Sequence, residues 1–409
     1  MRFTTRLLHD HFAPDAASGA TTQPIYQTSA YYQASAEEME KVFAGRKPGF
    51  VYTRVNNPTI AGFEQRINAL EGGVGAVACA SGMAAIMQAV LNVVSSGDEI
   101  VAAGGLYGGT SSIFRDLASY GIRVRYAADS SVEAFAACMT EKTRLVYVES
   151  IGNPKLDVPD IAALASMVHQ HEVPLFVDNT VTTPYLLQPI SLGADVVIHS
   201  TSKAINGNGN SIGGIVVSGG QFRWDAAKFP KFKDYAFGPL SFIVRMRMRM
   251  VTDYGGCMAP FNAYLTGIGL DTLALRLERI CANAQHLAEF CSQQSGILVN
   301  YPGLHSSPWH ALAKQQFHER YGAMLTLRLG SREKAYAFID SLHYALNVSN
   351  IGDARTLVIH PASTIFVHSS KQEKENAGVT DDLVRVNVGL EDIEDLQEDV
   401  EQALKKLQL

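Results

Sequence analysis

Short apolar runs alternate with helical patterns through the middle of the chain. Runs rich in β-branched and small apolar residues occur at 76–79, 99–103, 145–148, 175–177, 196–198 and 215–218. Each run is too short for a helix and is typical of a buried strand. Helical patterns lie at 83–94, 111–120 and 161–171. Strands joined by helices form βαβ units with parallel strands and right-handed crossovers. The pattern therefore predicts an α/β fold with a large, mostly parallel sheet.

Near Asp225 the short strands give way to longer helices. Residues 258–267 and 270–294 have apolar side chains at helical spacing. A smaller α+β region follows, and its predicted elements are strands at 324–329, 357–360 and 384–388 and a closing helix at 393–406. These patterns place a large domain at 61–260 and a C-terminal domain at 261–409.

The first sixty residues show no regular period. Residues 20–29 favour extended chain, residues 50–59 favour a polar loop, and a helix is predicted to begin near Thr59. A long irregular segment on a globular protein usually packs on something, often another subunit. We therefore interpret residues 1–60 as an arm that contacts a neighbouring subunit.

Composition narrows the class of protein. The chain has 409 residues, of which 47% are hydrophobic, and this is enough for two domains. Its net charge of -6 gives no basic field for nucleic acid, and no apolar run reaches membrane-spanning length. We expect a cytoplasmic protein. Neither a disulfide framework nor a metal site is predicted, because the five cysteines are scattered without Cys-x-x-Cys spacing.

One lysine stands out for its surroundings. The strand at 196–198 stops at a run of small hydroxyl residues that ends in Lys203, and a glycine-rich loop follows. A lysine at a strand end, beside hydroxyl groups that suit an anion, can form a Schiff base with an aldehyde if its pKa is lowered. Taken alone, such a lysine is more often a solvated surface residue.

The other strand ends also carry polar groups. Glu149 and Asp178 follow the strands at 145–148 and 175–177. The carboxyl ends of parallel strands meet along one edge, where open α/β sheets bind ligands. We therefore expect these acids to lie near Ser200 and Lys203, with the loops that carry Gly82 and Tyr107.

Three further positions have candidate chemistry. The turn at Ser81-Gly82 before a helix starting at Met83 is typical of an anion site, because free amide groups and the helix dipole point into it. Tyr107 lies among four glycines, which leaves its ring accessible for stacking on a planar ligand. Arg385 lies in an otherwise apolar strand, where it is either an ion-pair former or a carboxylate clamp.

With these residues in place, the whole chain resembles the Cys/Met-metabolism family of pyridoxal-phosphate (PLP) enzymes of fold type I. The likeness runs from Tyr52-Thr53-Arg54 to Val388-Gly389-Leu390-Glu391. It implies a large, mostly parallel seven-stranded sheet and a smaller C-terminal α+β domain. It also implies that Lys203 forms the Schiff base with PLP, and that Asp178 pairs with the pyridinium nitrogen.

The resemblance assigns further contacts to the cofactor and the substrate. Tyr107 is expected to stack on the ring and to assist proton transfer. The phosphate is expected to contact Gly82, Met83, Ser200 and Ser202, and also Tyr52 and Arg54 of a neighbouring subunit, as in a dimer or a tetramer of dimers. The substrate carboxylate is expected to contact Arg385, with help from Asn153, which also lies at the cofactor, and from Asn350.

Within that family the chain looks most like O-acetylhomoserine sulfhydrylases, in segments 149–154, 350–354 and 357–364. The implied reaction is a γ-replacement of methionine biosynthesis, in which acetate leaves and sulfide or a small thiol adds, giving homocysteine or methionine. Methionine γ-lyase and cystathionine γ-synthase are the alternatives. Lyases typically have a cysteine two residues after the stacking tyrosine, where this chain has Gly109. The acyl leaving group stays open.

Some positions depart from the sulfhydrylase pattern. Ile365 and Phe366 stand where a threonine and a histidine are common, so we expect a nucleophile bulkier or less polar than sulfide. Four further departures follow the lysine, at Ala204, Asn206, Asn208 and Asn210. A nicotinamide-dependent dehydrogenase is disfavoured, because no Gly-x-Gly-x-x-Gly follows the first strand.

Overall fold

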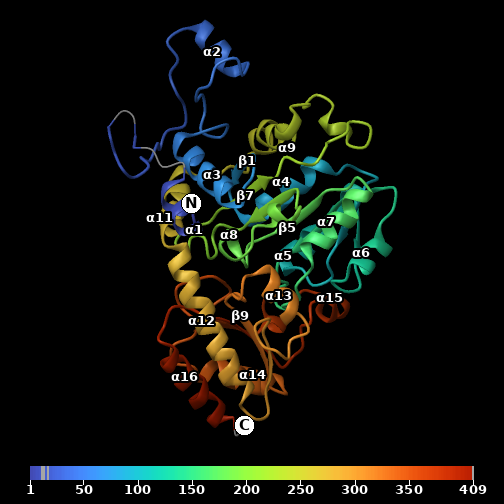
Figure 1. The fold of residues 1–409 in the computed structure, drawn as a ribbon, viewed down its shortest axis with the longest axis vertical. Coiled ribbons are helices and arrows are strands. Elements are labelled where there is room, and N and C mark those ends of the chain that lie inside the picture. The colour runs from blue at the N-terminus through green and yellow to red at the C-terminus, as the bar shows by residue number, and fades with distance from the viewer. Residues whose placement is uncertain (11–13, 16–17, 408–409) are drawn as a thin grey trace.

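The computed structural model describes residues 1–10, 14–15 and 18–407. Its larger sheet has seven strands in the order β1-β7-β6-β5-β4-β2-β3 (Figure 1). The bounds are β1 Gly75–Cys79, β2 Glu99–Ala102, β3 Arg123–Tyr126, β4 Thr143–Glu149, β5 Leu175–Asp178, β6 Val196–His199 and β7 Gly214–Ser218. Strands β2 to β6 are parallel, which confirms the arrangement predicted from the sequence. Strand β7 is antiparallel to β6 and β1, so β1 ends at the same edge as β4, β5 and β6.

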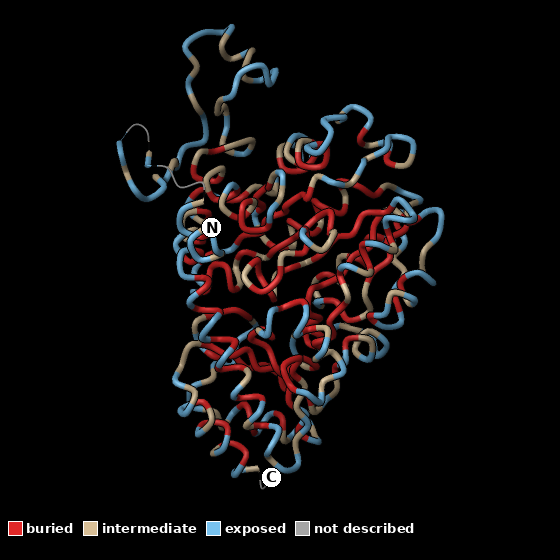
Figure 2. Tube along the Cα trace, in the orientation of Figure 1, coloured by how far each residue is buried: buried red, intermediate tan, exposed pale blue. Residues whose placement is uncertain are grey.

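Both faces of this sheet are covered by helices, and its strands are buried except for the edge strand β3 (Figure 2). Alternate side chains enter opposite cores. Val146 and Val148 pack with helices α3 and α7, whereas Leu145 and Tyr147 pack with α4 and α5 in what we call the α4-side core. The helices of this region are α3 Pro58–Glu71, α4 Gly82–Val93, α5 Gly108–Asp116, α6 Val132–Cys138, α7 Ile161–Gln170, α8 Thr183–Leu186, α9 Ser241–Arg245 and α10 Thr252–Tyr254.

The C-terminal region has a second sheet of five strands in the order β10-β11-β12-β9-β8. The long helix α12 runs from the large sheet region to this second one (Figure 1). The strands are β8 Leu298–Asn300, β9 Met324–Arg328, β10 Leu346–Asn347, β11 Leu357–Ile359 and β12 Leu383–Asn387. The helices are α11 Pro260–Asp271, α12 Leu273–Ser292, α13 His310–Gln316, α14 Arg332–Ser341, α15 Lys371–Asn376 and α16 Ile393–Lys406. Strands β9, β11 and β12 and helix α16 lie where the sequence predicts them.

The interpretation of the first sixty residues as irregular missed two helices, α1 Phe3–His9 and α2 Ala36–Phe43. Helix α1 packs on α3 and α11, with Leu7 buried and its carbonyl bonded by Arg66. Helix α2 projects away from the rest of the chain (Figure 1) and buries no side chain. Helix α1 has only seven residues, which is short for a periodic signal, whereas α2 does carry apolar residues at helical spacing, at Met39, Val42 and Phe43. The cap of α2 by Ser35, which accepts from the Glu38 N–H, was the readable cue.

Among the described residues, every helix is too short or too polar to cross a membrane.

Candidate active site

A cavity of about 350 Å³, which we call the main cavity because it holds most of the predicted site residues, opens at the carboxyl edge of the large sheet and is closed on the other side by the C-terminal region. Ten of the twelve residues that the sequence predicts as site residues line it. They are Gly82, Met83, Tyr107, Asn153, Asp178, Ser200, Ser202, Lys203, Asn350 and Arg385. Strand ends far apart in sequence thus supply one pocket, as parallel strands require.

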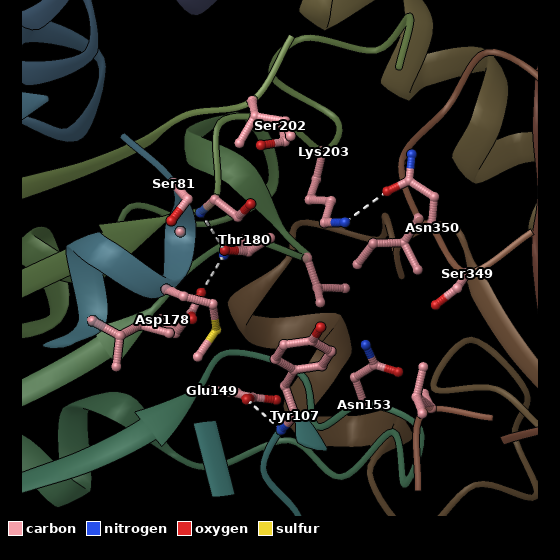
Figure 3. A pocket seen from close by; sticks show the side chains of 18 of the residues that line it. Ser81, Tyr107, Glu149, Asn153, Asp178, Thr180, Ser202, Lys203, Ser349 and Asn350 are labelled. Carbon is pink, nitrogen blue, oxygen red and sulfur yellow. Dashed lines mark hydrogen bonds between the residues drawn. The ribbon is translucent and has the colours of Figure 1, made fainter. Parts of the chain in front are cut away.

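Lys203 lies in the turn after β6 and points across the cavity. Its Nζ donates to the Asn350 Oδ1 at 2.6 Å (Figure 3). Burial lowers the pKa of the lysine, and the positive charge of Arg385 lowers it further. The contact depends on Gly352, which has φ +69° and packs so tightly that a Cβ would lie 2.3 Å from the Ala204 amide nitrogen. Only glycine lets this loop lie against the lysine turn.

Asp178 ends β5 and is held on both oxygens. Its Oδ1 accepts from the Thr180 N–H at 3.0 Å, and its Oδ2 accepts from the Tyr147 hydroxyl at 3.2 Å. Burial raises the pKa of this carboxyl, whereas the Thr180 bonds, the nearby His199 and the Tyr147 bond oppose that rise. The hydrogen bonds therefore favour the ionised form at a buried position.

A second carboxyl lies beside Asp178. Glu149 is its direct partner in the β4–β5 register. The Glu149 Oε1 accepts from the Tyr107 N–H at 2.6 Å, so this acid fixes the backbone of the tyrosine (Figure 3). Burial, and then the charge of Asp178, raise the pKa of Glu149 well above its usual range. Burial thus raises the pKa of both adjacent carboxyls, and the rise is larger for Glu149, which also faces the charge of Asp178.

The start of α4 forms an anion cradle. Ser81 caps the helix, its Oγ accepting from the Ala84 N–H at 3.1 Å. Helix geometry leaves the Gly82 and Met83 amides without partners inside the helix. Gly82 lies against Ser200, because a Cβ on residue 82 would come within 2.5 Å of the Ser200 Cβ. Backbone donors and a serine therefore meet at one point of the cavity.

Ser202 also lines the cavity, but its hydroxyl is engaged. Its Oγ accepts from the Gly213 N–H at 2.9 Å and lies 3.2 Å from the Gly213 carbonyl oxygen. Its side chain thus ties the lysine turn to the start of β7.

Arg385 reaches the cavity from β12 of the second sheet. Its guanidinium donates to the Asn153 Oδ1 at 3.0 Å and to the Asn350 backbone oxygen at 3.0 Å. The residue is 3% exposed, and burial lowers its pKa to about 10. Within the described ranges no carboxylate pairs with it. Of the two readings of this arginine, the geometry favours the clamp, since a buried guanidinium that faces a cavity suits an incoming carboxylate.

Tyr52 and Arg54 lie outside the main cavity. They line a separate surface hollow, where the guanidinium carbon of Arg54 lies 5.5 Å from the centre of the Tyr52 ring. Arg54 also donates to the Thr252 carbonyl. The structure of this single chain therefore does not bring these two residues to the predicted phosphate site.

The residues that depart from the sulfhydrylase pattern lie in different surroundings. Ile365 lines the cavity, whereas Phe366 is buried in a small cluster beside it. Asn206 and Asn210 bond each other at 2.9 Å between side chains, so these asparagines stabilise the loop after the lysine.

Two residues that the sequence analysis did not assign hold the site in place. Thr180 bonds Asp178 and also accepts from the Ser200 N–H at 2.8 Å. Tyr147 has the apolar appearance of a core strand residue, and only its packing reveals the bond to Asp178.

Across the described part of the chain, no group of three or more His, Cys, Asp or Glu residues is placed to hold a metal ion.

Comparison with known proteins adds three matches. Residues 4–405 match the model of the Cys/Met metabolism PLP-dependent enzymes. The chain is 41% identical to O-acetyl-L-homoserine sulfhydrylase of Leptospira meyeri, over 98% of this chain and 96% of the relative. A Campylobacter jejuni crystal structure, described as an O-acetylhomoserine (thiol)-lyase with N'-pyridoxyl-lysine-5'-monophosphate at position 205, superposes with a TM-score of 0.95. That match has 32% identity and covers 99% of this chain and 100% of the other.

Proposed function

The chain belongs to the Cys/Met metabolism family of PLP-dependent enzymes, and from this premise we propose that it catalyses γ-replacement on O-acetyl-L-homoserine. Sulfide or a small thiol would replace the acetyl group, giving homocysteine or methionine and acetate. The observation that carries the proposal is the convergence of Lys203, Asp178 and Arg385 in one cavity. The choice of acetate as the leaving group rests on the relatives that are named O-acetyl-L-homoserine sulfhydrylase.

The residues of the cavity fit PLP. The α4 cradle at Gly82, Met83 and Ser200 suits the phosphate, and the close approach of Gly82 to Ser200 leaves no room for a larger residue there. The carboxylate of Asp178 suits the ring nitrogen, and Lys203 suits the aldehyde carbon. When bound, PLP supplies an electrophilic aldehyde and a ring that accepts electrons.

Lys203 is the candidate base for the substrate Cα proton and later for a Cβ proton. Its lowered pKa increases the fraction of neutral amine, which is the form that accepts a proton. Asn350 takes one of its N–H bonds and so directs the amine across the cavity. Arg385 and Asn153 would bind the substrate carboxylate and set the Cα–H bond toward that amine.

The nucleophile is expected to be less polar than sulfide. Ile365, Ile212 and Ile351 all line the cavity, which gives it apolar surface suited to an alkyl thiol. Supplying O-acetylhomoserine with sulfide, methanethiol or cysteine in parallel tests this expectation. A clear preference for sulfide contradicts it and leaves the γ-replacement itself intact.

We also propose assembly into dimers, and of dimers into a tetramer, in the cytoplasm. Tyr52 is 44% exposed in this chain, and α2 projects into solvent on the same arm. A second copy packed on the arm would bring Tyr52 and Arg54 to its phosphate cradle. Analytical ultracentrifugation of the wild type and of an Arg54→Ala variant, with PLP affinity measured on both, tests whether these residues serve a partner's site.

The reaction is tested by absorbance and by product analysis. The purified wild type should be yellow with PLP, and Lys203→Ala should lack that band because the covalent link is lost. O-acetylhomoserine should give homocysteine only when sulfide is present. Formation of 2-oxobutanoate from methionine without any thiol would instead indicate a γ-lyase, and failure to take up PLP would overturn the assignment.

A further inference from the structure

Two of the five cysteines lie directly opposite each other. Cys79 ends β1, Cys257 precedes α11, and the two residues form an isolated antiparallel bridge. The Ala80 N–H donates to the Gly256 carbonyl at 2.8 Å, one residue after Cys79 and one before Cys257. A bond in that position marks the non-hydrogen-bonded type of pair, whose Cα atoms lie about 4.5 Å apart.

This spacing suits a disulfide. Cα atoms of bonded cysteines lie about 4.4–6.8 Å apart, and side chains of directly opposite residues point to the same face. Cys79 belongs to the α4-side core, and Cys257 packs against that same core. The remaining cysteines of the chain, Cys138, Cys281 and Cys291, take part in no such bridge within the described residues.

We propose that Cys79 and Cys257 form a redox-sensitive pair, which closes an intrachain disulfide when the protein meets a hydroperoxide. The sulfur of Cys257 attacks one peroxide oxygen, the O–O bond breaks, and water or an alcohol leaves. Cys257 is then a sulfenic acid. The sulfur of Cys79 next attacks the sulfur of Cys257, the S–O bond breaks, and the hydroxide leaves as water with the Cys79 proton. The two sulfurs lose two electrons in total, and the peroxide gains them.

The order of these steps follows from exposure. Cys257 is partly exposed, whereas Cys79 is fully buried. Burial, and then the charge of Glu64, raise the pKa of the Cys79 thiol, so it is a poor first target for an oxidant. We therefore expect the Cys79 thiol to react with the oxidised sulfur of Cys257, which lies directly opposite it, rather than with the oxidant.

The pair flanks the anion cradle. Cys79 is followed by Ala80 and by Ser81, which caps α4. Cys257 is followed by Met258, whose methyl group packs against Gly213, the residue bonded by Ser202. A disulfide would tie these two segments together, so we expect slower release of PLP from the oxidised protein. This consequence rests on the proposed function, whereas formation of the disulfide does not.

Peptide mapping of the full-length, PLP-loaded protein tests the pair. After treatment with hydrogen peroxide, free thiols are alkylated in denaturant and the protein is digested without reductant. We expect linked peptides containing Cys79 and Cys257, lighter by two hydrogen atoms and separated by dithiothreitol. Recovery of Cys79 as an alkylated thiol, while Cys257 is oxidised to a sulfinic acid, would overturn the proposal.

Matched variants separate the pair from general oxidation. Cys138→Ala should still form the linked peptides, because Cys138 is remote from the bridge. Cys257→Ala should leave Cys79 alkylated at the same peroxide concentration. The rate of PLP release, followed by absorbance during dialysis, is then compared between oxidised and reduced wild type. A severalfold slower release is expected after oxidation, and equal rates would overturn the link to the cradle.

Discussion

Glu149 offers the sharpest test of how the cavity is built. It is 6% exposed, it accepts the Tyr107 N–H at 2.6 Å, and its neighbour on β5 is a second carboxyl. If Glu149 is neutral, Glu149→Gln keeps an uncharged acceptor of nearly the same shape. Glu149→Ala removes the acceptor and leaves the Tyr107 amide without a partner at a partly buried position.

The magnitudes follow from that hydrogen bond. Leaving a buried donor unsatisfied costs about 1–3 kcal/mol, whereas keeping the bond through an amide should cost below about 1 kcal/mol. We therefore expect Glu149→Ala to lower the free energy of unfolding by the larger amount. It should also reduce kcat, because the Tyr107 ring loses its fixed backbone. Glu149→Gln should stay within a few-fold of wild-type activity.

The pH dependence of stability tests whether Glu149 is neutral, because neither replacement can ionise. An acid whose pKa is raised in the folded state binds more protons there than in the unfolded chain, so its contribution to stability falls as the pH rises above the unfolded pKa. Glutamine cannot ionise. We expect the melting temperature of Glu149→Gln, relative to wild type, to increase between about pH 5 and about pH 8. An equal loss of stability and activity in both variants, without this trend, would refute the neutral state.

Three further substitutions address the other supports of the site. Tyr147→Phe removes the hydroxyl that donates to Asp178, so PLP affinity should fall about tenfold in a titration of the apoprotein, and unchanged affinity would remove Tyr147 from the site. Arg385→Lys replaces a planar guanidinium by a point charge, so KM for O-acetylhomoserine should rise roughly a hundredfold with a smaller change in kcat. A change in kcat alone would argue against the role of Arg385 as a carboxylate clamp. Gly352→Ala introduces a Cβ at positive φ in a crowded turn, so the free energy of unfolding should fall by at least about 2 kcal/mol in urea. In the same protein the absorption band of PLP bound through Lys203 should titrate at a different pH. A variant as stable as wild type would contradict the crowding.

Much of the fold was readable because each signal was local. The apolar runs that became β4, β5 and β6 are buried on both faces, and such strands appear in sequence as continuous apolar stretches. The edge strand β3 was missed because it alternates arginines with partly exposed residues. Its Arg125 pairs with Glu99 of the neighbouring strand, a contact that no local pattern reveals.

The site could be predicted from the sequence only in part, because only some of its residues lie within local patterns. Polar residues at strand ends indicated that Asp178 and Lys203 would lie near one another, since the sheet edge brings them together. The hydrogen bonds that hold these side chains in place could not be predicted from the sequence. The bond from Lys203 to Asn350 joins segments 147 residues apart, and it depends on how the second sheet packs on the first. The roles of the predicted site residues remain predictions until the variants are measured.

The polar groups that line the cavity come from two different sheets. Asp178, Glu149 and Lys203 come from the edge of the large sheet, whereas Arg385 comes from β12 of the small one. Asn350 joins the two sides, because its side chain accepts from Lys203 while its backbone oxygen accepts from Arg385. A shift of the small sheet would therefore move the proposed carboxylate clamp and the proposed base together. If these roles hold, their spacing sets where a substrate Cα lies, so we expect a change in packing at Gly352 to alter activity as well as stability.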